Sequence, residues 1–361
     1  MIPIAKPQLD DGEIQAVTDV LRSGIIAEGQ RVAEFEEAFA EYTGTQYAVA
    51  VNSGTAALHA ALLAHGIGKD DEVITSSFSF IATANSILFT GAKPVFTDIR
   101  ADTFNLDENL IEEKITPATK AIMPVHLYGH PAEMDAIKDI AEDHGLIIIE
   151  DACQAHGATY RGKKVGSFGT GAFSFYPTKN MTTSEGGIIT TNNEEVAAKA
   201  RMIRAHGSKQ RYLHEMLGYN LRMTDISAAI GLTQLKKLPD YTSGRQHNAK
   251  LLNEKLSDIE GILCPTVKEN CTHSFHQYTI RTHDRDELSD YLRTKGIGSG
   301  IYYPIPTHRQ PFYKEMGYND SLLVTEKASR EVLSLPVHPG VTDEDIDTIA
   351  NSIIDWGGLK C

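Results

Sequence analysis

Residues 146–152 read LIIIEDA and residues 171–177 read GAFSFYP, two apolar runs that place Asp151 and Lys179 at or just beyond their ends. A short apolar run that closes on carboxylates is typical of a buried strand. No helical stretch separates the second run from GIITT at 187–191. We therefore expect those two strands to pair with each other, with an irregular turn at 178–186.

In the part of the chain before these two runs, short apolar runs alternate with helical stretches. The runs are YAVAVN (47–52), EVIT (72–75), PVFTDI (94–99) and AIMPVH (121–126), and the helical stretches are 55–65, 80–90 and 132–144. Two amphipathic stripes, 12–22 and 32–43, precede them. Alternation of buried strands and helices is typical of an α/β domain with a mostly parallel sheet.

The expected order of helices and strands changes near Pro239. Helical stretches are expected at 194–205, 224–237 and 240–257, followed by a strand at 276–282, a helix at 285–296, a loop at 301–311 and a last helix at 343–356. We therefore predict a large α/β domain over 1–240 and a smaller C-terminal α+β domain over 241–361.

Composition narrows the classes of function. The chain has 361 residues and a formal net charge of −14, which argues against nucleic acid or an anionic membrane as the main partner. Cys153, Cys264, Cys271 and Cys361 form no C-x-x-C pair, so neither a metal site nor a disulfide framework is expected. With no signal peptide and no long apolar run, a cytoplasmic location is predicted.

The turn Asn52-Ser53-Gly54-Thr55 follows a strand and opens a helix. A small turn at a helix N-terminus leaves backbone N–H groups free and places the positive end of the helix dipole there, which suits a phosphate. The alternative is an ordinary helix cap by Ser53 or Thr55.

Glu150 and Asp151 end the run LIIIEDA. Ligands of open α/β sheets bind at the carboxyl ends of strands, and a partly buried carboxylate there needs a positive partner. A pyridinium nitrogen would serve; a helix cap or a structural ion pair is the alternative.

Lys179 follows a strongly apolar strand, where a surface lysine is out of place. A lysine in a desolvated pocket has a lowered pKa and becomes a usable nucleophile and base. Ser174 could donate its hydroxyl to a phosphate. The alternative for Lys179 is a solvated lysine in a turn.

The order of phosphate turn, acidic strand end and lysine resembles the DegT/StrS-type nucleotide-sugar aminotransferases, a branch of the fold-type I enzymes that depend on pyridoxal 5′-phosphate (PLP). The resemblance runs nearly from end to end. It is carried by VNSGTAALHAAL (51–62), SSFSFIATANSILFTGAKPVFTDI (76–99), PVHLYGHPAEM (124–134), residues 147–180, SEGGIITT (184–191), residues 201–235 and IYYPIPTHRQPFY (301–313).

The resemblance implies a role for each matching position. Lys179 would hold PLP as a Schiff base and move the proton in catalysis, while Asp151 would bind the pyridine nitrogen. The other implied cofactor contacts are Gln154 at the 3-hydroxyl side, Gly54, Thr55 and Ser174 at the phosphate, Phe80 stacked on the ring, and Asn220 reaching the cofactor of a second subunit. The last of these implies a homodimer with shared active sites.

The resemblance also suggests the substrates. L-Glutamate would be the amino donor and a nucleotide-linked keto sugar (UDP, GDP or dTDP) the acceptor, giving an amino sugar for glycan or polysaccharide biosynthesis. The run Thr182–Gly187 contains Glu-Gly-Gly, which is similar to relatives acting at C4 of 4-keto-6-deoxy sugars; relatives with Gly-Asp-Gly-Gly often act at C3. Candidate substrate contacts are Glu185, His206, Arg222, Tyr303 and His308.

Three other functions compete with this interpretation. A related sugar dehydratase would have His at the position of Lys179, so the lysine argues against it. A PLP-binding sensor or regulator without turnover would carry the same site, although no DNA-binding appendage is visible. An aminotransferase for a keto-cyclitol or an amino-benzoate precursor stays open.

Overall fold

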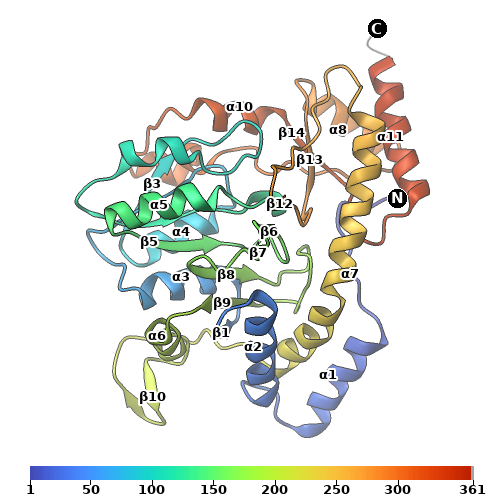
Figure 1. Cartoon of the computed structure of the whole chain (residues 1–361). Coiled ribbons are helices and arrows are strands. Elements are labelled where there is room, and N and C mark those ends of the chain that lie inside the picture. The colour runs from blue at the N-terminus through green and yellow to red at the C-terminus, as the bar shows by residue number, and fades with distance from the viewer. Residues whose placement is uncertain (359–361) are drawn as a thin grey trace.

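The core of the protein is a seven-stranded sheet. The computed structural model describes residues 1–358, and Figure 1 shows the sheet within its helices. Its order is β1 (Tyr47–Val51), β9 (Gly187–Thr191), β8 (Thr170–Ser174), β5 (Ile147–Asp151), β4 (Thr119–Met123), β2 (Glu72–Ser76) and β3 (Lys93–Thr97). β9 runs antiparallel to both neighbours, and the other pairs are parallel. The predicted mostly parallel sheet and the predicted pairing of β8 with β9 are confirmed.

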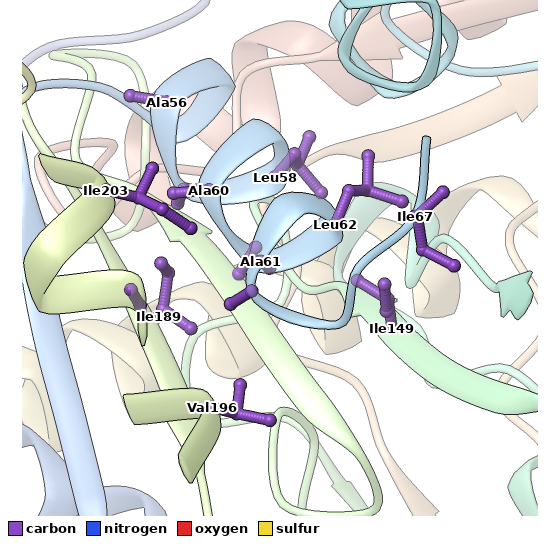
Figure 2. Close-up of a cluster of buried hydrophobic side chains, with 14 of the residues drawn as sticks. Ala56, Leu58, Ala60, Ala61, Leu62, Ile67, Ile149, Ile189, Val196 and Ile203 are labelled. Atoms are coloured by element: carbon purple, nitrogen blue, oxygen red, sulfur yellow. The ribbon is translucent and has the colours of Figure 1, made fainter. Parts of the chain in front are cut away.

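Helices cover both faces of this sheet. On β1, Val49 and Val51 pack into a cluster with α3 (Gly54–Ala64) and α6 (Glu194–Arg204), which Figure 2 shows. The alternating Ala48 and Ala50 pack instead with α2 (Gln30–Thr43). α4 (Ala82–Phe89) contacts α3, and α5 (Met134–His144) contacts β4 and β5. Because both faces are buried, the inner positions of the strands are mostly apolar and show no regular alternation in the sequence.

Strand direction decides where functional groups gather. Since β1 and β8 are both antiparallel to β9, they run parallel to each other. The carboxyl ends of β1, β2, β4, β5 and β8 therefore lie at one edge of the sheet, where ligands of such sheets bind.

The predicted helices 224–237 and 240–257 are wrong as separate elements. A single helix, α7 (Asp225–Leu256), passes through Pro239 without ending (Figure 1). Its first half buries Leu235 and Leu238 in the core of the large unit, whereas its second half buries Leu252 and Leu256 in another core. The packing of the two halves of α7 into these two cores offsets the free-energy cost of a proline within the helix. This packing cannot be recognised from the local sequence.

The second core belongs to a smaller unit. It joins the end of α7 to β13 (Tyr278–Arg281), β14 (Val332–Leu335), α8 (Arg285–Thr294) and α11 (Asp343–Gly358). β13 and β14 pair antiparallel. Ile2, at the start of the chain, also packs here, while α1 (Asp11–Ser23) contacts α7. The predicted boundary at 240 falls inside α7 and stays a prediction.

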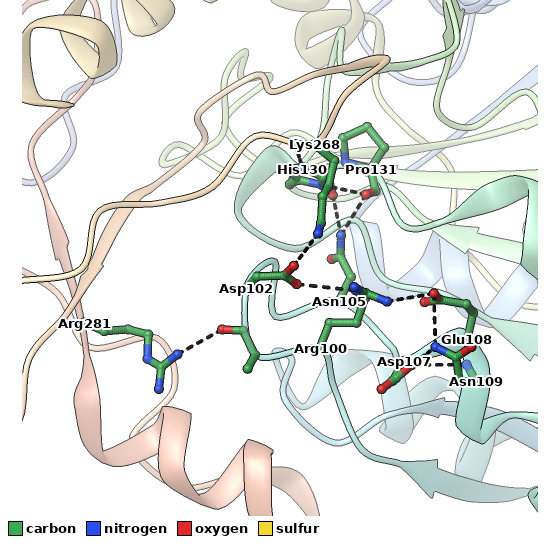
Figure 3. Close-up of polar contacts among 11 residues, drawn as sticks. Arg100, Asp102, Asn105, Asp107, Glu108, Asn109, His130, Pro131, Lys268 and Arg281 are labelled. Atoms are coloured by element: carbon green, nitrogen blue, oxygen red, sulfur yellow. Dashed lines mark hydrogen bonds and ion pairs between the residues drawn. The ribbon is translucent and has the colours of Figure 1, made fainter. Parts of the chain in front are cut away.

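Polar contacts tie the two units together, as Figure 3 shows. Lys268 forms an ion pair with Asp102, and Arg281 donates a hydrogen bond to the carbonyl of Ala101 at 3.0 Å. Asn105 donates to the carbonyls of His130 and Pro131, which fixes the turn after β4. The loop after β3 is thus held against the smaller unit.

Shorter elements complete the described chain. They are the paired segments β6 (Thr159–Tyr160), β7 (Lys163–Lys164) and β12 (Cys271–Thr272), the hairpin β10 (Ser208–Gln210) and β11 (Leu213–His214), α9 (Pro311–Glu315) and α10 (Leu323–Glu331). Cys153, Cys264 and Cys271 are free thiols, and Cys361 lies outside the described residues. Within 1–358, no helix is both long and apolar enough to cross a membrane.

Candidate active site

A cavity of about 350 Å³ lies at the carboxyl edge of the sheet. Nine of the predicted site residues line it: Gly54, Thr55, Phe80, Asp151, Gln154, Ser174, Lys179, Glu185 and Tyr303. They come from strand ends, helix starts and a loop of the smaller unit, so parallel strands and the packing of the second unit both contribute to the site.

Lys179 projects into this cavity from the irregular turn after β8. Its side chain is partly buried, and loss of solvation lowers its pKa; the nearby Cys153 and Asp151 oppose that shift. A lowered pKa increases the share of neutral amine at a given pH, and the neutral amine is the form that acts as nucleophile and base.

Asp151 is buried at the end of β5 and already has two hydrogen-bond donors. The hydroxyl of Thr83 donates to its Oδ2 at 2.7 Å, and the backbone N–H of Cys153 donates to Oδ1 at 3.2 Å. Thr83 in turn lies 2.8 Å, oxygen to oxygen, from the hydroxyl of Ser79. These donors fix the orientation of the carboxylate.

Glu150, one residue earlier, has a different role. Its carboxylate is fully buried and accepts from the N–H groups of Gly166, Phe168 and Gly169 and from Nε2 of His126. Of the two carboxylates that end LIIIEDA, Glu150 therefore fixes the loop before β8, and Asp151 is the one that reaches the cavity.

The start of α3 closes the cavity at its other end. Ser53 caps the helix by accepting from the N–H of Ala56. The N–H groups of Gly54 and Thr55, in the first turn, have no acceptor within the helix and are available to a ligand. A Cβ on Gly54 would lie 2.5 Å from Cβ of Ser174, so only glycine permits this close approach of α3 to β8. The dipole of α3 and the hydroxyl of Ser174 make this end suitable for a phosphate.

Gln154 and the aromatic residues form the remaining wall. Oε1 of Gln154 accepts from the N–H of Tyr128 at 3.0 Å, and Nε2 donates to the hydroxyl of Tyr303 at 3.1 Å. The ring of Phe80 lies 6.1 Å from that of Tyr303 and is 54% exposed, with a face free toward the cavity.

Four predicted contacts lie outside the lining of this cavity. Asn220 and His206 are exposed, and Nε of Arg222 lies 4.0 Å from Glu28. His308 is buried, with Nδ1 2.6 Å from the hydroxyl of Ser77 and Nε2 3.4 Å from Glu326. Their binding roles stay predictions, since the described chain does not bring them to Lys179.

The sequence reasoning missed other lining residues, among them Thr83, His276 and Gln277. Thr83 was detectable only as one position in the predicted helix 80–90, and the hydroxyl that matters meets Asp151 across 68 residues of chain. His276 and Gln277 come from the smaller unit, which pattern reasoning could not dock onto the sheet.

These residues match the requirements of PLP. The cavity offers a lysine amine, a carboxylate held for a pyridine nitrogen, an exposed aromatic face and a helix N-terminus with a hydroxyl for a phosphate. Within 1–358, no group of three or more His, Cys, Asp or Glu is placed to hold a metal.

Comparisons with known proteins agree with this geometry. Residues 7–354 match the model of the DegT/DnrJ/EryC1/StrS aminotransferase family. The chain is 44% identical to a Geobacillus stearothermophilus protein named pleiotropic regulatory protein, over 97% of this chain and 95% of that one. It is 43% identical to the GDP-perosamine synthase of Caulobacter vibrioides, over 96% of each.

Solved structures give the same result. DesV of S. venezuelae, solved with a ketimine intermediate, is 40% identical with a TM-score of 0.94, covering 96% of this chain and 94% of that one. A putative sugar aminotransferase of Streptococcus pneumoniae, solved in its PLP form, is 30% identical with a TM-score of 0.93 over 99% of each chain. PLP is therefore the cofactor, and the chain belongs to the DegT/DnrJ/EryC1/StrS family of PLP-dependent aminotransferases.

Proposed function

We propose that this enzyme transfers the amino group of L-glutamate to the carbonyl of a nucleotide-linked keto sugar, with C4 of a 4-keto-6-deoxy hexose as the favoured position. The observation that carries the proposal is the placement of Lys179 opposite the buried Asp151 in one cavity. The similarity to GDP-perosamine synthase supports a nucleotide-linked sugar.

Position C4 rests on the run after Lys179. Glu185 lies in that run, is exposed, and lines the cavity, where it can contact a sugar. C3 of a 3-keto sugar is the alternative acceptor position, and a keto-cyclitol is the alternative class of substrate.

Different residues of this chain would bind the cofactor and transfer the proton. Bound PLP supplies an electron sink at its ring. Asp151 would pair with the protonated ring nitrogen, and Thr83 and the N–H of Cys153 hold the carboxylate of Asp151 in place. Lys179 would hold the cofactor at rest, and its neutral amine would move a proton between the substrate carbon and the cofactor. The first turn of α3 and Ser174 hold the phosphate in place.

We propose a homodimer because the site of one chain is short of positive charge. Among the described lining residues, Lys179 is the one Lys or Arg side chain, yet the cofactor phosphate, glutamate and a sugar diphosphate are all anionic. Asn220 and Arg222 lie outside the cavity of their own chain and are candidates to serve the second copy. Equimolar reassembly of Lys179→Ala and Asn220→Ala chains tests this: half of the dimers are then mixed and carry one intact site of two, so activity of the mixture near one quarter of wild type supports shared sites, and no recovery contradicts them.

A panel of keto sugars tests the substrate. The enzyme, with glutamate, would be incubated with UDP-, GDP- and dTDP-linked 4-keto and 3-keto sugars, and products identified by mass spectrometry and NMR. Amination at C4 supports the proposal; amination at C3 alone, or of cyclitols alone, overturns that part of it.

A sensor without turnover is the second candidate, favoured by the name of the relative from G. stearothermophilus. Glutamate alone separates the two. Bleaching of the visible absorption of the bound cofactor by glutamate supports catalysis, whereas absorption that no amino donor changes supports a sensor.

A further inference from the structure

The turn after β4, residues 127–129, has no role in the function proposed above, although its sequence helped to identify the family. Tyr128 in this turn adopts φ 58° and ψ 0°, a left-handed conformation that a bulky residue rarely takes. Such a conformation is unfavourable for a bulky residue and persists only where surrounding contacts hold it. The contacts that hold Tyr128 are made with residues that line the cavity.

Three bonds hold Tyr128, each to a different segment. Its N–H donates to Oε1 of Gln154 at 3.0 Å, its carbonyl accepts from the N–H of Gln277 at 3.1 Å, and its hydroxyl donates to the carbonyl of Tyr302. Gln154, Gln277 and Tyr302 all line the cavity. Tyr128 itself is 3% exposed and is absent from the lining, so it acts on the cavity through these neighbours.

The bond from Tyr128 decides which way the amide of Gln154 points. Because a backbone N–H needs an acceptor, the oxygen of the amide must face Tyr128 and the NH₂ group must face the other way. One hydrogen of Nε2 goes to the hydroxyl of Tyr303. The second hydrogen is available to an acceptor in the cavity.

We propose that Tyr128 and Tyr303 are positioning residues that clamp Gln154, so that its amide presents an N–H donor to the ring oxygen of the bound cofactor. The clamp joins the turn after β4, the loop after β5 and the loop 301–303 of the smaller unit. It requires PLP in the cavity but does not depend on which sugar is aminated.

The clamp predicts a pH-dependent spectroscopic effect. A donor to the ring oxygen stabilises its negative charge, so the proton that this oxygen would share with the imine nitrogen joining the cofactor to Lys179 leaves at lower pH. Loss or misplacement of the donor raises the pH midpoint of the visible absorption of the bound cofactor. The groups that face Gln154 and Tyr303 are Asp151, Cys153, Tyr302 and Tyr128. Replacing Tyr303 removes no group that is charged at neutral pH.

The test uses the PLP-loaded enzyme without substrates. Gln154→Ala and Tyr303→Phe are each expected to raise the midpoint by about 0.5 to 1 pH unit. The double variant is expected to shift it no further than the larger single change, because both act through one amide. Gln154→Glu keeps an acceptor for Tyr128 but offers an oxygen to the cavity, and is expected to raise the midpoint further.

Tyr313→Phe is the matched control. Tyr313 is likewise a tyrosine from the part of the chain after 300, but its hydroxyl bonds to Asn85 and it lies outside the lining. Its midpoint should equal that of wild type. The proposal is overturned if Tyr303→Phe leaves the midpoint unchanged while Gln154→Ala shifts it, or if the two shifts add in full. Should Tyr303→Phe fail to fold, Gln154→Glu decides by the same absorption, and a midpoint equal to or below that of wild type overturns the proposal.

Discussion

The two edges of the central sheet each carry a cavity, and the one at the carboxyl edge is the candidate active site. The cavity at the amino edge is comparable in size. Its charged lining residues include Lys138 and Glu142, which pair with each other on the surface at 3.3 Å and are mostly exposed. At the carboxyl edge, Lys179 and Asp151 are withdrawn from solvent and face one cavity. Desolvated groups that converge, rather than volume, therefore mark the site.

Adjacent residues of β5 point to opposite faces of the sheet. Glu150 accepts from the N–H groups of Phe168 and Gly169, which line the cavity at the amino edge, whereas Asp151 lines the cavity at the carboxyl edge. One carboxylate is saturated by four donors and is structural; the other keeps capacity for a ligand. This difference can be tested from either side.

The largest effect is expected at Lys179. Lys179→Ala should lower steady-state transamination by at least about 1000-fold, because both the anchor of the cofactor and the proton-transferring base are lost. Lys138→Ala, at the other edge, should leave turnover unchanged. Steady turnover by Lys179→Ala would show that Lys179 is not the catalytic residue.

Asp151→Asn should come next. Without a carboxylate the ring nitrogen loses its proton, so we expect kcat to fall by roughly 100-fold, or about 2.7 kcal/mol of transition-state stabilisation. Unfolding in urea should change little. Glu142→Gln is the control at the amino edge, and equal activities of the two variants would contradict the contrast.

Glu150→Gln should show the reverse pattern. An amide NH₂ would face N–H donors in a buried site, so the free energy of unfolding should fall by roughly 2 to 3 kcal/mol. Specific activity of the folded fraction should stay close to wild type. A fully active and fully stable variant would show that the four donors contribute nothing.

Thr83→Val should have a smaller effect, about a tenfold decrease in kcat, since Asp151 loses one donor and its fixed orientation. Thr83→Ser should restore most of the rate. Thr170→Val removes an equivalent hydroxyl, bonded to His65 at the amino edge, and should leave kcat unaltered. If both valine variants slowed the enzyme equally, Thr83 would have no special role.

The smallest effect concerns His65. Burial, with a contribution from Lys199, lowers the pKa of His65 to about 4. Between the ordinary value of 6.5 and about 4, the unfolded state binds more protons than the native state, so this contribution to stability is lost as pH falls through that window. His65→Gln should flatten the decline of Tm on the acid side. If the curves of Tm against pH were parallel for wild type and His65→Gln, the prediction would be wrong.

Much of the site could be predicted from the sequence because its chemistry is local. Asp151 ends an apolar run, Gly54 sits between a strand and a helix, and Lys179 follows a strand, so period and composition locate each of them. His308 shows the limit of such reasoning. It lies in a stretch that resembles the family, yet its side chain is buried against Ser77 and Glu326 and not in the cavity.

The sequence by itself determined the α/β class, the pairing of β8 with β9, and the positions of the candidate cofactor residues that follow a strand or begin a helix. Only the tertiary structure decided that α7 continues through Pro239, that Glu150 turns into the loop before β8 while Asp151 turns into the cavity, and that Thr83, Tyr128 and Tyr303 come together around one cavity. The physical reason is distance along the chain. Periodicity reports which face of a segment is buried, but a hydrogen bond between residues tens to hundreds of positions apart depends on how whole segments dock.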